Sequence, residues 1–326
     1  MVVLQKVHGS NNQFFLLDQT TLTQALNSQE LQNLAQKITK KDFFGGVDGL
    51  LVVDSSSVPA ALGKMRVYNA DGSRALMCGN GLRTVSRYLA TKHQQDQFLV
   101  ETDQANLQVQ KQTPWAPQIP AYSVEISPVS FQANKLPFAN LGTDQLINQI
   151  VPQFDPQLKF TALAVPNPHL ISFVSAAVME GPLLKELGEK LNQTNPYFPE
   201  GVNLSFAQVK KADELFVRTF ERGVGFTNAC GTGMSATSLA YFLTQPQVPA
   251  MGTQLTIKNP GGMVQTRVHQ GSSEQYWIEL SGNATVIAEI QLPEADLRHG
   301  NLQPENYAYN ETGEALAYQN FVQQLS

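Results

Sequence analysis

The only two cysteines of the chain, Cys78 and Cys230, each begin the same short pattern, Cys-Gly-x-Gly. Each pattern is followed by a run of residues with helical spacing. Glycines allow the backbone to approach a ligand closely, and the free N–H groups of a helix start attract anions. A cysteine at that place has a lowered thiol pKa. The duplication predicts two half-sites that hold one small anionic molecule, with a thiol on either side.

Two simpler interpretations of these cysteines exist. In the first, each cysteine is a small buried hydrophobic side chain, which is the usual state of a free intracellular cysteine. In the second, the two cysteines form a disulfide with each other. The repeated glycine context favours two functional thiols over both alternatives.

The segments around the cysteines resemble the two signature motifs of the diaminopimelate epimerase family. Residues 69–83 read NADGSRALMCGNGLR, and residues 221–233 read ERGVGFTNACGTG. The resemblance extends from about residue 6 to about residue 286, which is most of the chain. It implies an epimerase without cofactor or metal that interconverts LL- and meso-2,6-diaminopimelate, a step toward lysine and peptidoglycan precursors.

The resemblance implies that proton transfer at the α-carbon uses two bases. One of Cys78 and Cys230 starts as thiolate and the other as thiol, and the roles exchange in the reverse direction. His169 and Glu221 are expected to adjust the thiols, one near each cysteine. Backbone N–H groups would bind the α-carboxylate and stabilise the carbanion-like transition state; these belong to Gly79, Asn80, Gly231 and Thr232.

Diaminopimelate carries a second amino-acid centre, so its enzyme must also bind a distal carboxylate and ammonium. A guanidinium suits the carboxylate and Asn side chains suit the remaining groups. By family match, the expected substrate contacts are Asn12, Asn69, Asn167, Asn203, Glu221 and Arg222.

The chain departs from the family pattern at several places. Asn11 and Gln13 flank Asn12 where the family has Gly and Asp, and Phe226 replaces a Glu four residues before Cys230. Asn283 also stands where the family usually has Pro. The departures at 13 and 226 favour a second hypothesis, a related two-thiol racemase of histidine or proline. A third hypothesis is a non-catalytic amino-acid-binding protein with the same fold.

Strand-like and helix-like patterns alternate in both halves, with one long helix after each Cys-Gly step. We therefore predict an α+β fold of two similar domains, each a mixed sheet around a central helix. The family fold places the active site in the cleft between them. The predicted domains are 1–125, completed by a strand near 285–292, then 126–284, and a polar tail at 293–326. Within these, we expect helices at 23–40 and 315–325 and an irregular, proline-rich edge at 113–121.

Composition limits the classes of partner. The 326 residues include 42% hydrophobic and 15% charged side chains, which is typical of a globular protein with a core. A net charge of −5 argues against nucleic acid or anionic membranes as partners. No signal peptide or membrane span is recognised. Two cysteines without a secretion signal indicate a cytoplasmic protein, and a homodimer is compatible with the resemblance.

Overall fold

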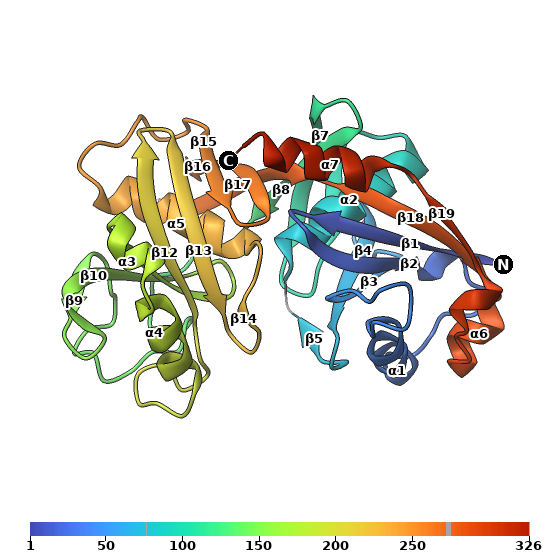
Figure 1. The fold of residues 1–326 in the computed structure, drawn as a ribbon, viewed down its shortest axis with the longest axis horizontal. Helices are drawn as coiled ribbons and strands as arrows, with labels where there is room; N and C mark the ends of the chain where they lie inside the picture. Colours follow the sequence, from blue (N-terminus) through green and yellow to red (C-terminus); the bar gives the residue numbers. More distant parts are fainter. Residues whose placement is uncertain (76, 272–274, 326) are drawn as a thin grey trace. The chain divides into compact units, whose positions relative to one another are not determined.

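The computed structural model describes residues 1–75, 77–271 and 275–325 (Figure 1). The chain forms two compact units. Unit 1 comprises Met1–Val124 and Ser281–Ser326, and unit 2 comprises Glu125–Leu280. The chain leaves unit 1 within β8 (Ile119–Ile126) and returns to it within β17 (Tyr276–Asn283).

Unit 1 is built on a mixed sheet whose strands pair in the order β19-β18-β1-β2-β3-β4-β6-β7-β8. The pairs β2–β3 and β4–β6 are parallel, and the other pairs are antiparallel. Its further elements are β1 (Val2–Gly9), β2 (Asn12–Asp18), η1 (Gln19–Thr21), α1 (Ser28–Ile38), β3 (Gly49–Asp54), β4 (Ala61–Asn69), β5 (Arg74–Ala75), α2 (Gly79–His93), β6 (Gln97–Glu101), β7 (Asn106–Ala116), β18 (Thr285–Leu292), α6 (Glu294–His299), η2 (Pro304–Asn306), β19 (Ala308–Glu311) and α7 (Glu314–Gln323).

Unit 2 repeats this plan. Its strands pair in the order β9-β10-β11-β12-β13-β15-β16, and the pairs β11–β12 and β13–β15 are parallel. The elements are β9 (Gln149–Val151), β10 (Asp155–Ala164), β11 (Pro168–Phe173), α3 (Ala176–Glu180), α4 (Leu183–Asn192), β12 (Asn203–Lys211), β13 (Glu214–Glu221), β14 (Gly225–Phe226), α5 (Gly231–Thr244), β15 (Leu255–Asn259) and β16 (Gly262–Gln270).

The common plan explains where the cysteine helices lie. Parallel neighbours in a sheet need a crossover connection, usually a helix. In unit 1 the second crossover, between β4 and β6, is α2; in unit 2 the second crossover, between β13 and β15, is α5. Both helices begin directly after a cysteine. The mixed-sheet α+β fold with two similar units, predicted from the sequence, is confirmed.

Burial shows that these two helices are central in their own units. Every residue of α5 from Gly231 to Tyr241 is buried, and so is every residue of α2 from Gly79 to Ser86. A helix that is buried on all sides lies inside a unit rather than on its surface. The packing around α2 and α5 therefore fixes where each helix begins, and with it where each cysteine lies.

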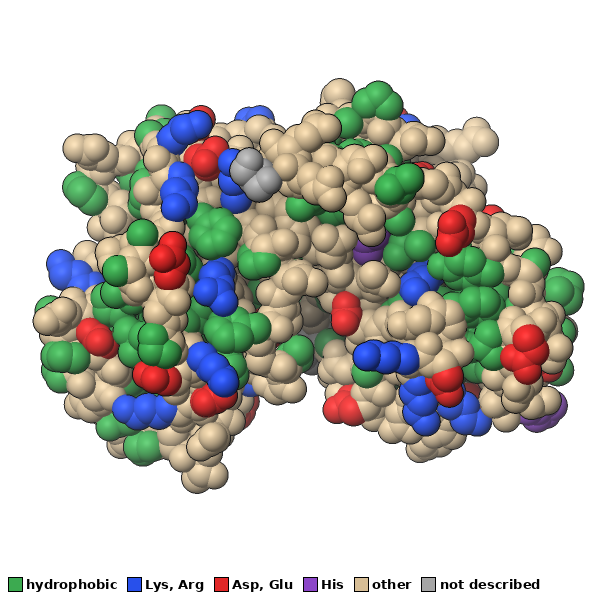
Figure 2. All heavy atoms as spheres, viewed as in Figure 1, with side chains coloured by type: hydrophobic (Ala, Val, Ile, Leu, Met, Phe, Trp, Pro, Cys, Tyr) green, Lys and Arg blue, Asp and Glu red, His purple; other side chains and the backbone are tan. Residues whose placement is uncertain are grey.

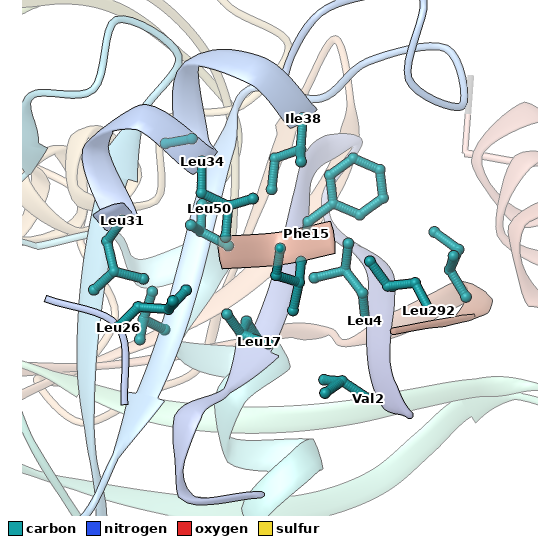
Figure 3. Close-up of a cluster of buried hydrophobic side chains, with 14 of the residues drawn as sticks. Val2, Leu4, Phe15, Leu17, Leu26, Leu31, Leu34, Ile38, Leu50 and Leu292 are labelled. Atoms are coloured by element: carbon teal, nitrogen blue, oxygen red, sulfur yellow. The ribbon is translucent and has the colours of Figure 1, made fainter. Parts of the chain in front are cut away.

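The core of unit 1 joins the beginning of the chain to its end. Figure 3 shows side chains of α1, such as Leu34 and Ile38, directed at Phe15 on β2 and at Leu4 on β1. Leu292 from β18 belongs to the same cluster. The helix begins later than the predicted residue 23 because Asn27 forms a capping box with Glu30.

The proline-rich stretch is not irregular as predicted. β7 continues to Ala116 and forms a hairpin with β8. The register shifts between Gln112 and Ala116, and Pro114 lies in this shifted segment. A proline without an N–H group is tolerated there because no regular ladder bond is required of it.

Residues 293–326 are folded onto unit 1. β19 extends the sheet by pairing with β18, and α7 lies along β18 (Figure 1). The predicted helix at 315–325 is confirmed as Glu314–Gln323, and its Tyr318 is fully buried. The polar composition of this segment did not reveal that the helix is anchored to unit 1 through a buried side chain.

Candidate functional site

Cys78 is the N-cap residue of α2. Its sulfur accepts a hydrogen bond from the Gly81 N–H at 3.3 Å, which is the bond that a Ser or Asp side chain would make at this place. A Cβ on Gly81 would come within 2.6 Å of Leu51, so only glycine allows the first turn to pack so closely on β3. The Gly-x-Gly step thus seats the thiol at the positive end of the helix.

Asn12 links the β1–β2 hairpin to this thiol. Its Oδ1 lies 3.9 Å from the Cys78 sulfur and accepts a hydrogen bond from the Asn80 amide at 3.3 Å. The Asn12 amide donates to Asp48 at 2.7 Å, and the backbone N–H of Gln13 donates to the same carboxylate oxygen at 2.8 Å. Asp48 therefore holds the Asn12 side chain in its orientation.

The hairpin turn itself accounts for one departure from the family pattern. Ser10 and Asn11 both have positive φ, 52° and 63°, as a two-residue type I′ hairpin requires. Asparagine tolerates this region better than most residues, so Asn11 is compatible with the turn in place of Gly. The Asn11 N–H also donates to His8 Nδ1 at 3.2 Å. The loss of the family Gly at this position leaves the turn intact.

Asn69 is the last residue of β4 and the first residue of the first motif. Its amide donates to the Ser73 hydroxyl at 3.0 Å, and its side chain is exposed. It pairs across the sheet with Gly49, the residue after Asp48. Asn69, Asn12 and Cys78 thus all belong to unit 1.

Cys230 is the N-cap residue of α5 and is only 6% exposed. Its sulfur lies 3.7 Å from the Thr232 hydroxyl. A Cβ on Gly233 would lie within 3.2 Å of the same sulfur and within 3.0 Å of Thr219. As in unit 1, the second glycine of the motif lets the helix start against its own cysteine and a neighbouring strand.

The pKa of Cys230 differs from the sequence-based expectation. A lowered pKa was expected at a helix start, but burial raises it well above the ordinary value, and the negative charge of Glu221 raises it further. The hydrogen bond with Thr232 acts in the opposite direction without cancelling these effects. In this conformation Cys230 is a thiol at neutral pH. Glu221 is itself held by the hydroxyl of Thr227, with which it forms a short hydrogen bond.

His169, Asn203 and Arg222 form a second group in unit 2. His169 on β11 and Asn203 on β12 are direct neighbours in the parallel register. The Asn203 side chain accepts the Arg222 N–H at 2.9 Å. His169 is fully buried, and burial together with the Arg222 charge lowers its pKa to about 3, so it is neutral at physiological pH. Asn167 lies in the tight turn that joins β10 to β11.

The side chain of Phe226 packs against an aromatic ring and a guanidinium. Its ring lies 5.5 Å from that of Phe220, edge to face, and 5.0 Å beneath the Arg218 guanidinium. The side chain remains 44% exposed. The replacement of a carboxylate at this position therefore adds aromatic packing on β14, while the carboxylate that acts on Cys230 comes from Glu221.

Each unit thus assembles part of the predicted site. Unit 1 brings together Asn12, Cys78, Gly79 and Asn80, and unit 2 brings together His169, Asn203, Glu221, Arg222, Cys230, Gly231 and Thr232. Sequence reasoning missed several supporting residues. For Asp48, the Asp-Gly step at 48–49 was the available signal. Arg83 and Tyr318 gave no local signal, and Asn283 was noted only as a departure from the family pattern, because the three residues meet only in the folded unit.

Charges on the surface are mixed in sign. Figure 2 shows Lys and Arg side chains interspersed with Asp and Glu on the face in view. In residues 1–75, 77–271 and 275–325, no helix has the length and hydrophobicity needed to cross a membrane. Within the same ranges, no group of three or more His, Cys, Asp or Glu side chains is arranged to hold a metal ion.

Comparison with known proteins adds a family assignment. A sequence profile described as "Diaminopimelate epimerase" matches residues 4–116 and 161–287. A diaminopimelate epimerase of Lactiplantibacillus plantarum is 50% identical, over 100% of this chain and 99% of that protein. One from Ligilactobacillus salivarius is 47% identical, over 98% of each.

A solved structure supports the fold independently of sequence. The Bacillus anthracis phenazine biosynthesis protein of the PhzF family superposes with a TM-score of 0.63 at 17% identity. The match covers 88% of this chain and 97% of that one. At such low identity the likeness concerns the fold alone. The profile match and the two close relatives show more: this chain belongs to the diaminopimelate epimerase family.

Proposed function

We propose that this protein is an isomerase that interconverts LL- and meso-2,6-diaminopimelate by two-base proton transfer between thiols. The observation that carries the proposal is the equivalence of Cys78 and Cys230. Each is the N-cap residue of the second crossover helix of its unit. Inversion of an α-carbon needs one group to remove a proton from one face and another to return a proton to the other face.

The proposed roles follow from the surroundings of each thiol. Cys230 is held as a thiol by burial and by Glu221, so it acts as the acid in the direction that starts from the resting enzyme. Cys78 then acts as the base. After each turnover the protonation states are exchanged, which makes the reverse direction equivalent. The backbone N–H groups at the starts of α2 and α5 stabilise the negative charge that develops on the α-carboxylate.

The distal amino-acid centre accounts for the remaining polar residues. We assign Arg222 to the distal carboxylate because a guanidinium binds it with two parallel hydrogen bonds. Asn203 fixes the backbone of Arg222 at 2.9 Å and supports this assignment. Asn69 and Asn167 are assigned to the distal polar groups, and Asn12 to the substrate beside Cys78. His169, neutral and buried next to Asn203, is assigned a positioning role.

Substrate competition tests the proposal. The protein is incubated with LL-diaminopimelate, L-proline or L-histidine, and the product isomers are separated by chiral chromatography. We expect meso-diaminopimelate to form and both monocarboxylic amino acids to remain unchanged. Racemisation of proline or histidine without reaction of diaminopimelate would favour the related-racemase hypothesis. Tight binding of diaminopimelate without any isomerisation would favour the non-catalytic one.

The wider context follows from this activity. Diaminopimelate isomers serve lysine and peptidoglycan precursor synthesis, so we place the protein in the cytoplasm, where two free thiols remain reduced. A homodimer is part of the proposal and is checked by light scattering at working concentration.

A further inference from the structure

Arg83 is a fully buried cation on α2, five residues after Cys78. Burial lowers its pKa only to about 10, so the guanidinium remains charged at neutral pH. It donates to the Asn283 carbonyl at 3.1 Å and to the Ser10 hydroxyl at 3.2 Å. In the part of the chain that the structure describes, no carboxylate lies within 4 Å of it. A buried charge of this kind is costly unless an anion offsets it.

The guanidinium lies in a slot shaped for it. A Cβ on Gly282 would come within 2.6 Å of the Arg83 side chain, and one on Gly9 within 2.8 Å. Asn283, next to Gly282, donates to His8 and accepts the Ser10 N–H at 2.8 Å. The β1–β2 turn and the end of β17 therefore enclose Arg83 from two sides.

The Arg83 guanidinium lies beside the Cys78 step, because its Nη1 donates to the carbonyl of Gly79, the residue after Cys78, at 3.5 Å. Two ionisable groups attract its charge, Tyr318 and Cys78. Burial raises the pKa of Tyr318 to about 12, so its hydroxyl stays neutral at physiological pH. Of these two groups, Cys78 is the one that can supply an anion. The same attraction that stabilises the guanidinium must favour the thiolate form of Cys78.

The C-terminal segment closes this enclosure. Tyr318 on α7 forms a hydrogen bond with Ser10, the residue that accepts from Arg83, and its ring meets that of His8 edge to face at 4.9 Å. Tyr318 is fully buried. It therefore separates Arg83 from solvent on the side of α7.

A second contact links α7 to α2, the helix that begins after Cys78. Glu314, at the start of α7, forms a two-pronged ion pair with Arg87 on α2 at 2.6 and 2.7 Å. Its carboxylate also accepts the Val286 N–H of β18 at 2.9 Å. Both side chains are largely shielded, with 13% of Glu314 and 21% of Arg87 exposed. Bidentate Arg–carboxylate pairs are the strong class of ion pair.

We propose that the C-terminal segment Ala308–Gln323 is a functional part of the Cys78 half-site. In this proposal, Tyr318 and Ser10 hold the buried Arg83 guanidinium as the resident counter-charge of the Cys78 thiolate, and Glu314 fixes α7 to α2. Tyr318 and Arg83 are positioning residues. The proposal rests on the catalytic role proposed for Cys78. The segment lies beyond residue 287, where the match to the family profile ends.

The test measures the ionisation of Cys78 without any substrate. In the full chain carrying Cys230→Ala, iodoacetamide alkylation of the single remaining thiol is followed from pH 5 to 10. We expect Arg83→Gln to lower the rate at pH 7 about tenfold and Tyr318→Phe to lower it about threefold, because a tenfold loss of thiolate corresponds to one pKa unit. The plateau rate at high pH is expected to stay unchanged in both.

Tyr309→Phe is the matched control. Tyr309 lies on β19 of the same segment but stacks on Phe44, and we expect its removal to leave the profile unchanged. An unchanged profile in Tyr318→Phe would overturn the proposal, and so would a uniform fall at every pH, which indicates general structural damage. If Arg83→Gln does not fold, Tyr318→Phe decides alone. A shifted profile in a protein that does not isomerise diaminopimelate would sustain this inference and reject the proposed function.

Discussion

Cys78 and Cys230 occupy the same position, the N-cap, of two topologically equivalent helices, but the charged residues around them have opposite signs. The buried guanidinium of Arg83 attracts Cys78, whereas the carboxylate of Glu221 opposes ionisation of Cys230. Equivalent backbone positions are therefore surrounded by charges of opposite sign. A two-base enzyme needs this asymmetry, because one thiol must begin as base and the other as acid.

Removal of either thiol is expected to stop epimerisation. Cys78→Ala and Cys230→Ala should each lower kcat by at least about a hundredfold, the lower range for loss of a general acid or base. One thiol cannot serve both faces of the α-carbon. The measurement is the rate of meso-diaminopimelate formation, with thermal unfolding recorded in parallel to verify the fold.

Serine at the same positions provides the matched comparison. A hydroxyl still donates a proton but is a poor base, so Cys230→Ser should retain more activity than Cys230→Ala in the direction in which Cys230 is the acid. Substantial activity in either alanine variant would contradict the two-base assignment.

The Glu221 carboxylate is expected to control the ionisation of Cys230. It raises the pKa of this thiol, so Glu221→Gln should lower that pKa and increase alkylation of Cys230 at pH 8 severalfold. The measurement uses a Cys78→Ala background, in which Cys230 is the only thiol. Equal alkylation profiles with and without the Glu221 charge would show that burial alone governs Cys230.

Asp48 is expected to matter for catalysis although it lies outside both motifs. Its carboxylate receives hydrogen bonds from the Asn12 side chain and the Gln13 backbone, and charge-assisted bonds are each worth about 1.5–3 kcal/mol. Asp48→Ala should therefore lower kcat/KM roughly tenfold by releasing Asn12. Asp42→Ala, at an exposed position of the preceding loop, is the control and should remain near the native value. Similar losses in both variants would reject the specific role of Asp48.

Two buried histidines should make the fold sensitive to acid. Burial lowers the pKa of His8 and of His169 to about 3. The unfolded chain binds these protons near pH 6.5, so the stabilisation is complete above pH 6.5 and is lost as the pH falls toward 3. Each histidine should reduce the free energy of unfolding by about 1.4 kcal/mol per pH unit in that window. Urea titrations at pH 7, 6 and 5 measure this slope.

His8→Asn isolates one of these contributions. The Asn oxygen replaces the Nδ1 acceptor that receives the Asn11 N–H, and it has no proton to gain. The dependence of the free energy of unfolding on pH should become less steep by the contribution of one histidine. The control His299→Asn, at an exposed position, should leave this dependence unchanged. Equal slopes in the native protein and His8→Asn would contradict the account.

The architecture of each unit was predictable because its signals are local. The Cys-Gly-x-Gly steps at 78 and 230 mark the starts of α2 and α5, since glycine and capping chemistry act within one helical turn. The prediction of irregular structure at 113–121 was wrong because a proline is tolerated where the strand pairing shifts. The pairing register of a strand cannot be read from its own sequence.

The environment of the thiols was less predictable. A helix start predicts a lowered thiol pKa, but at Cys230 burial and Glu221 outweigh the dipole, and burial is a property of the whole unit. Arg83 read as an ordinary helix residue. Its contacts with Ser10 and Asn283 span 73 and 200 positions of sequence. Such contacts have no periodicity or spacing that a sequence displays.

Isotope distribution in deuterium oxide tests the two-thiol mechanism most directly. LL-diaminopimelate is added to enzyme equilibrated in deuterium oxide, and both isomers are examined by mass spectrometry during the first few per cent of conversion. A thiol carries a single proton, so the account predicts one α-deuterium in the meso product, from the opposite thiol, and almost none in the recovered LL substrate. Deuterium appearing equally in both pools at this stage would indicate one base serving both faces and would contradict it.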